Sequence, residues 1–136
     1  MGESQTHIDL VKLIHEFSIS IVPKDFHCFI RVDSPITKKP KDVIENFIPD
    51  LYYCYNNLLI IGEAKTLNDF DTKHSKAQYD AYLKKCDLFE GKAVFVVAVP
   101  WELVFTAKNY FRLVKQKNNA FTKIVVIDEM GGKFIL

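Results

Sequence analysis

Asp50, Glu63 and Lys65 are the residues of this sequence whose types and spacing could perform metal-dependent chemistry, with the two carboxylates as the metal ligands. Lys65 lies two residues beyond Glu63, so in a β-strand both side chains project from the same face. Carboxylates are the hard oxygen ligands that Mg²⁺ or Mn²⁺ takes in proteins. A Pro-Asp pair is also common in simple turns, and Glu-x-Lys is common on a solvated strand face. The metal-binding interpretation therefore depends on whether the fold brings the two carboxylates together.

A predicted β-hairpin brings them together. Apolar runs flank Asn56-Asn57, and asparagine tolerates the positive φ that a tight hairpin turn needs. If Tyr55 pairs with Leu58, the register continues outward until Asp50 stands opposite Glu63, with β-carbons roughly 4.5–5.5 Å apart. Like charges placed directly opposite destabilise a sheet. A bound cation between the two carboxylates would remove that repulsion, so folding and metal affinity should be coupled.

The rest of the chain predicts an α/β (α+β) domain over residues 1–136, with a mixed central sheet flanked by helices. Thr6 is placed to cap the first helix, and Ser75 with Gln78 matches a helix capping box. Ala93 to Val99 is a continuous apolar run, which is typical of a strand buried on both faces. The predicted helices cover about 7–18, 72–89 and 101–117, and the predicted strands cover 26–32, the hairpin 49–66, 93–99, 123–128 and a short 134–136.

Composition limits the possible functions. The charge is nearly balanced, with 18 basic and 17 acidic residues, so any nucleic-acid surface must come from local patches. Cys28, Cys54 and Cys86 are widely spaced and indicate neither a zinc site nor a disulfide framework. The first two lie in apolar runs, which favours buried thiols. The absence of a signal-like start and of long apolar runs favours a cytoplasmic protein without a membrane span.

The element order, with Pro49-Asp50 on one strand and Glu63-Ala64-Lys65 on the next, resembles the PD-(D/E)XK nuclease superfamily. The resemblance covers about residues 7–100 and implies a restriction-endonuclease-like αβββαβ core. The segment 71–78 is similar to the acidic turn, serine and glutamine that follow the lysine in virus-type replication-repair (VRR) nuclease domains. Gln78 with Tyr82 also resembles the QxxxY element of RecB-type exonucleases. Archaeal Holliday junction resolvases are similar in size and core motif, but they lack the Gln78 element.

This resemblance implies a metal site and a catalytic set. Asp50, Glu63 and the backbone carbonyl of Ala64 would ligate Mg²⁺ or Mn²⁺. Lys65 would orient the attacking water or stabilise charge on the phosphate, with Gln78 completing the set. Glu16 resembles the first-helix acid that some members add to the metal site.

Residues outside the carboxylate pair have more than one interpretation. Gln78 suits a capping box or the active site, and the two roles are compatible. Tyr82 suits core packing or nucleic-acid contact. His74, Lys73 and Lys76 could contact a phosphate backbone, and a solvated helix face explains them equally well. Lys39, in the lysine loop 38–41, could clamp nucleic acid or only favour solubility, while Trp101 favours the core over a base-stacking surface.

We therefore expect a small Mg²⁺- or Mn²⁺-dependent deoxyribonuclease. One domain leaves little room for base readout, which favours cleavage directed by DNA structure or by DNA ends. A homodimer would place two sites on two strands of a duplex or a junction. The alternatives are a non-catalytic module that binds nucleic acid or protein on the same fold, and a nuclease subunit that a partner chain directs.

Overall fold

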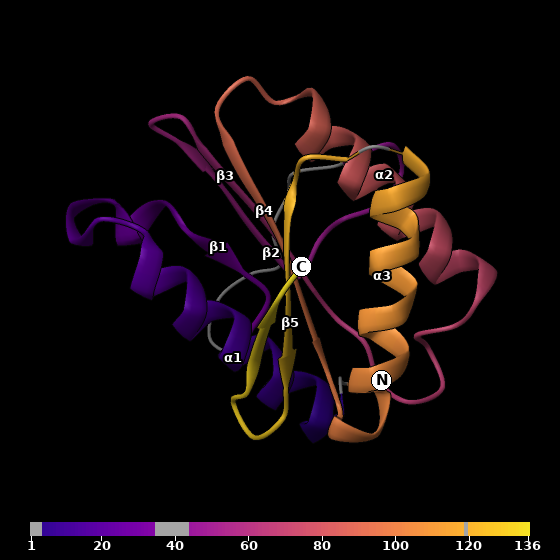
Figure 1. Ribbon diagram of the computed structural model, residues 1–136. Helices are drawn as coiled ribbons and strands as arrows, with labels where there is room; N and C mark the ends of the chain where they lie inside the picture. The colour runs from indigo at the N-terminus through magenta and orange to yellow at the C-terminus, as the bar shows by residue number, and fades with distance from the viewer. Residues whose placement is uncertain (1–3, 35–43, 119) are drawn as a thin grey trace.

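The computed structural model describes residues 4–34, 44–118 and 120–136, and it has three layers. A mixed sheet forms the middle layer. Helix α1 (Gln5–Ile21) covers one face, while α2 (Lys73–Leu88) and α3 (Val104–Asn118) cover the other, as Figure 1 shows. The α+β architecture with a mixed sheet flanked by helices is therefore confirmed. None of the helices in these ranges is long and apolar enough to cross a membrane.

The described sheet has six strands in sequence order, so each strand pairs with its neighbour in the chain. The first two pairings are antiparallel, β3 to β4 and β4 to β5 are parallel, and the last is antiparallel. The carboxyl ends of β3, β4 and β5 therefore meet at one edge of the sheet. The strands are β1 (Arg31–Val32), β2 (Leu51–Tyr55), β3 (Leu58–Ala64), β4 (Lys92–Val99), β5 (Lys123–Asp128) and β6 (Lys133–Ile135).

The predicted hairpin register is confirmed from Tyr55↔Leu58 to Leu51↔Gly62. Asn56 and Asn57 both have positive φ, at 54° and 63°, as a two-residue turn of this kind requires. The ladder ends at Leu51, so Asp50 stands just before β2 instead of within it. Beyond this point the side chain of Asp50 accepts a hydrogen bond from the backbone N–H of Ala64.

Alternating strand residues form two cores on the two faces of the sheet. Leu10, Val11 and Ile14 of α1 pack on one face, against residues such as Ile60 and Val96. The opposite face carries an aromatic-rich core with α2 and α3. It includes Phe70, Tyr79, Tyr82, Phe95 and Phe111, whose rings make edge-to-face and tilted contacts. Packing in the two cores fixes the position of the helices along the strand direction. Both α1 and α2 begin near the carboxyl end of β3.

Several local predictions were wrong. The strand predicted over 26–32 is reduced to Arg31–Val32, and a 3₁₀ helix, Lys24–Phe29, precedes it, with Phe26 and Phe29 packed against Tyr55. Helix α1 begins earlier than predicted, since Ser4 caps it in place of Thr6.

Two burial predictions were also wrong. Cys28 and Cys54 are exposed, near the 3₁₀ helix and the hairpin tip, where the helical layers do not cover the chain. Trp101 is 62% exposed and does not belong to the core.

Gly62 allows α1 to pack closely on the hairpin. A β-carbon added there would lie 2.5 Å from Ile14 Cγ2 and 3.2 Å from Leu51 Cβ. Because a β-branched isoleucine has little freedom to move aside, we expect Gly62→Ala to lower the free energy of unfolding by about 1–3 kcal/mol. Urea unfolding measures this. The loss should shrink in an Ile14→Ala background, and equal losses in both backgrounds would show that the contact with Ile14 is not the cause.

Candidate active site at the carboxyl end of β3

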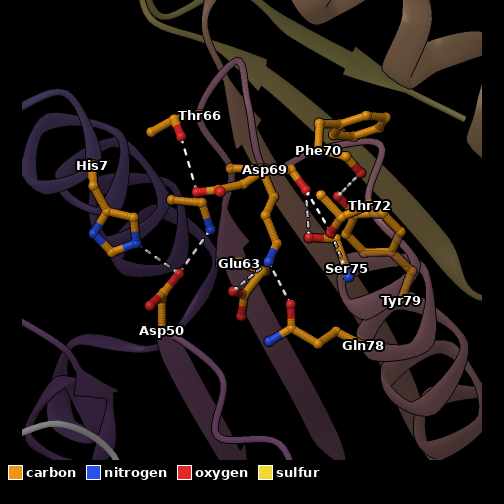
Figure 2. Close-up of polar contacts among 12 residues, drawn as sticks. His7, Asp50, Glu63, Thr66, Asp69, Phe70, Thr72, Ser75, Gln78 and Tyr79 are labelled. Carbon is orange, nitrogen blue, oxygen red and sulfur yellow. Dashed lines mark hydrogen bonds and ion pairs between the residues drawn. The ribbon is translucent and has the colours of Figure 1, made fainter. Parts of the chain in front are cut away.

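A cleft of about 330 Å³ opens at the carboxyl end of β3. Its walls come from four places: the first turn of α1, the residue before β2, the end of β3 with the loop that follows, and α2. Asp50, Glu63, Lys65 and Gln78 all line it, each only 5–7% exposed. Figure 2 shows His7 from α1 and Gln78 from α2 approaching the carboxylates of Asp50 and Glu63 from opposite sides. The predicted catalytic residues are therefore in one place.

Asp50 is oriented through one of its two carboxylate oxygens. Oδ2 accepts a hydrogen bond of 2.9 Å from the backbone N–H of Ala64, and it lies 3.3 Å from His7 Nε2. These contacts fix the plane of the carboxylate and leave Oδ1 for another ligand. The end of the hairpin and the start of α1 thus hold Asp50 in the cleft.

Glu63 is a buried carboxylate with an unused oxygen. Oε2 lies 3.6 Å from Lys65 Nζ, while Oε1 has no hydrogen-bond partner among the described residues. Burial, and next the nearby charge of Asp50, raise the pKa of Glu63 well above its ordinary value, against the opposing effect of Lys65. A buried carboxylate oxygen without a partner is costly unless a cation or water binds it. Oε1 of Glu63 is therefore a candidate ligand for a cation or a water molecule.

Lys65 lies between Glu63 and Gln78. Its ammonium donates a hydrogen bond to Gln78 Oε1, and its backbone N–H donates to the carbonyl of Ala98 at 3.0 Å. The capping-box interpretation of Gln78 is wrong, because Thr72 caps α2 and its hydroxyl accepts the N–H of Ser75. Gln78 is thus free of capping and holds the lysine toward the cleft.

The loop between β3 and α2 is fixed by Asp69, which the sequence analysis did not identify. Its carboxylate accepts a hydrogen bond from Thr66 Oγ1 at 3.0 Å, and its backbone carbonyl accepts from the hydroxyls of Thr72 and Ser75. Figure 2 shows this network beside Glu63. Asp69 lines the cleft and is exposed, so it adds a negative charge at the entrance.

Neither Tyr82 nor Glu16 lines the cleft. Tyr82 is fully buried among Phe47 and Phe95, so it packs in the core and cannot contact a nucleic acid. Burial, and then the carboxylates of Glu63 and Asp50, raise the pKa of its hydroxyl. Glu16 is exposed and lies nine residues beyond His7, on the opposite side of α1 and about 13 Å further along it. This position separates Glu16 from Asp50 and Glu63 and gives its expected role as a metal ligand no support.

Three of the predicted nucleic-acid contacts, His74, Lys73 and Lys76, lie on the surface of α2. His74 is exposed and packs edge-on against Phe47, which precedes a residue of the cleft wall. Lys73 is exposed. Lys76 forms an exposed ion pair of 2.9 Å with Asp71 and lies over the ring of Tyr110, on the α3 side. Lys39 lies outside the described residues.

His7 is the main residue of the site that the sequence analysis missed. Ser4 Oγ accepts its backbone N–H, which fixes the first turn of α1, and its ring meets Asp50. The two residues are distant in sequence, so no local pattern links them. The available signal was a histidine at the start of a helix that packs over the hairpin.

Within the described ranges, no three His, Cys, Asp or Glu side chains are grouped closely enough to hold a metal ion. A cation would therefore have to rely on Asp50, Glu63, the carbonyl of Ala64 and solvent. That number of protein ligands is typical of Mg²⁺ sites, which keep several waters. Comparisons of the chain with protein-family models, curated proteins and solved structures find no match.

Proposed function

We propose that the protein is a metal-dependent nuclease that hydrolyses DNA phosphodiester bonds. The proposal rests on Oε1 of Glu63, which has no hydrogen-bond partner in the described part of the chain and is buried beside Asp50 in a cleft that also holds Lys65. Two buried carboxylates that repel one another weaken a fold, so their presence calls for a positive ligand. Mg²⁺ or Mn²⁺ fits their hard oxygens.

Each residue has a distinct part in this proposal. Asp50 Oδ1 and Glu63 Oε1 would hold the cation together with the carbonyl of Ala64. When bound, the cation supplies a Lewis acid that polarises the phosphate and lowers the pKa of water. Lys65 can offer an N–H donor to a phosphate oxygen, because its ammonium has three donors, one of which is bonded to Gln78, while Glu63 Oε2 lies 3.6 Å from Nζ. That donor would stabilise charge that develops on the phosphate.

The fold agrees with a restriction-endonuclease-like core, which we include in the proposal. Helix α1, the antiparallel β1–β2–β3, the crossover helix α2 and the parallel strand β4 follow one another in the αβββαβ order. The carboxylates lie where β2 and β3 part, and the lysine follows one position after β3. Structure- or end-directed cleavage is favoured, because the cleft walls include few basic side chains for base readout.

The test is cleavage of labelled DNA with Mg²⁺ or Mn²⁺. Purified protein should degrade at least one of a linear, nicked, branched or single-stranded substrate, and EDTA or Asp50→Asn should stop it. If the wild type and Asp50→Asn leave every substrate equally intact, the nuclease proposal fails. Binding of DNA or of a protein without cleavage would support the non-catalytic module, and cleavage only with a co-purifying chain would support the partner-directed subunit.

His7 offers a prediction about metal affinity. We expect His7→Ala to weaken Mn²⁺ binding by about 10–100-fold, because Asp50 loses a contact that orients its carboxylate. Calorimetric titration measures this, and His7→Gln, which keeps a donor, should recover part of the loss. His15→Ala, on the same helix and outside the cleft, is the matched control. Equal Mn²⁺ affinity of His7→Ala and wild type would show that His7 does not position Asp50.

A further inference from the structure

A second hollow, of about 390 Å³, adjoins the catalytic cleft, and Ser4 and Thr66 line both. Its other walls are the loop after β3, the turn after β4 and Glu129 after β5. Figure 1 shows the start of α1 and the turn after β4 at the same end of the sheet. The hollow therefore lies at the carboxyl ends of the three parallel strands, where open α/β sheets bind ligands.

The hollow is lined by negatively charged side chains, whereas a phosphate-binding site is lined by positive charge. Its charged lining residues are Glu102 and Glu129, both exposed, and no lysine or arginine lines it within the described ranges. Two carboxylates repel a phosphate. They accept hydrogen bonds from amino groups, such as the exocyclic amines on the edges of nucleobases. Glu129 Oε1 already accepts the backbone N–H of Trp101 at 3.0 Å, which fixes this carboxylate beside the turn.

Apolar surface lies beside these carboxylates. Leu67 lines the hollow and is 52% exposed, opposite Pro100. Trp101 stands in the chain between Pro100 and Glu102, two lining residues, and its indole is exposed in the 3₁₀ turn Trp101–Leu103. Unpaired bases stack on exposed aromatic side chains, so this indole, which neighbours two lining residues in the chain, offers a stacking surface beside the hollow. The volume falls in the range of small-molecule pockets.

We propose that this hollow receives an unpaired nucleobase next to the scissile phosphate, so that the substrate is DNA with a single-stranded segment at the cleavage point. The inference rests on the proposed nuclease function. A nucleotide whose phosphate lies in the catalytic cleft has its neighbour within reach of the hollow, because the two cavities share a wall. A base inside a continuous duplex would first have to leave its stack, which costs a few kcal/mol.

The binding experiment follows the fluorescence of Trp101, which is the single tryptophan of the chain and therefore the source of all indole emission. Indole emission is recorded with Ca²⁺, which can occupy the site in place of Mg²⁺. The titrants are a blunt DNA duplex and the same duplex with an unpaired overhang. The overhang should change the emission at lower concentrations than the blunt duplex. Equal responses to both would overturn the inference.

The cleavage experiment uses the same two duplexes with Mn²⁺. Leu67→Ala and Trp101→Ala should each lower the preference for the overhang by roughly tenfold. Phe121→Ala is the matched control, because Phe121 is almost fully exposed just before β5, at the opposite end of the sheet. Equal cleavage of both duplexes by wild type and variants would overturn the inference and leave the nuclease proposal standing. Selective emission changes without any cleavage would overturn the nuclease proposal and support the base-binding hollow.

Discussion

Replacement of Lys65 by methionine is expected to lower the rate of DNA cleavage by about 10²–10³-fold. Methionine keeps an unbranched apolar side chain out to the ε position and removes the ammonium that lies between Glu63 and Gln78. The loss should appear in the catalytic rate at saturating Mn²⁺, because the lysine would act on charge that develops on the phosphate. Initial rates on a labelled oligonucleotide measure the effect.

The matched control for this variant is Lys85→Met, which removes an exposed lysine of α2 that does not line the cleft. Its rate should equal that of the wild type. Because Lys65 is buried, its replacement could also destabilise the fold. Thermal unfolding of both variants shows whether a lower cleavage rate comes from the missing ammonium or from a less stable protein. A folded Lys65→Met protein with the wild-type rate would remove Lys65 from the proposed mechanism.

Glu63→Gln is expected to make the metal-free protein more stable at neutral pH, by about 1–2 kcal/mol. The raised pKa of Glu63 means that its charged form is less favourable in the folded protein than in water, even with Lys65 nearby. A neutral amide of the same shape removes both the burial of charge and the repulsion from Asp50. The same substitution should abolish stabilisation by Mn²⁺, because one of the two carboxylate ligands is lost.

The raised pKa of Glu63 also predicts how the stability of the folded protein changes with pH. A carboxyl whose folded pKa is raised binds its proton more tightly in the folded state, so its contribution to stability is fully present below the unfolded pKa. That contribution is lost as the pH rises from the ordinary value of about 4.5 through the folded pKa. The wild type should therefore lose stability with rising pH relative to Glu63→Gln.

Urea unfolding of both proteins in EDTA, across a pH series, measures this difference. A variant that is less stable than the wild type at neutral pH would contradict the account of Glu63. So would a difference in stability that does not change with pH.

The sequence predicted the hairpin well because its determinants are local. The Asn56-Asn57 turn fixes the register through backbone conformation, and the apolar runs on both sides of the turn mark the two strands. The same reasoning placed Glu63 and Lys65 on one face. The buried strand β4 was equally clear, because an unbroken apolar run suits a strand with helices on both sides.

Contacts between distant segments could not be predicted in this way. The pairing of His7 with Asp50 depends on how far α1 slides along the sheet, which Gly62 and Ile14 decide by close packing. Gln78 could equally have capped α2, and the competition was settled by Thr72, an alternative cap. Trp101 is apolar by composition, yet the turn after β4 projects it beyond the helical layers.

Mn²⁺ soaked into crystals of the protein would test the central claim most directly, through its anomalous scattering. The account predicts an anomalous peak in the cleft, within bonding distance of Asp50 Oδ1 and Glu63 Oε1, and no such peak in Glu63→Gln crystals. A wild-type crystal at millimolar Mn²⁺ without an anomalous peak between these carboxylates would contradict a metal site built on Asp50 and Glu63. An anomalous peak of equal height in Glu63→Gln crystals would contradict it as well.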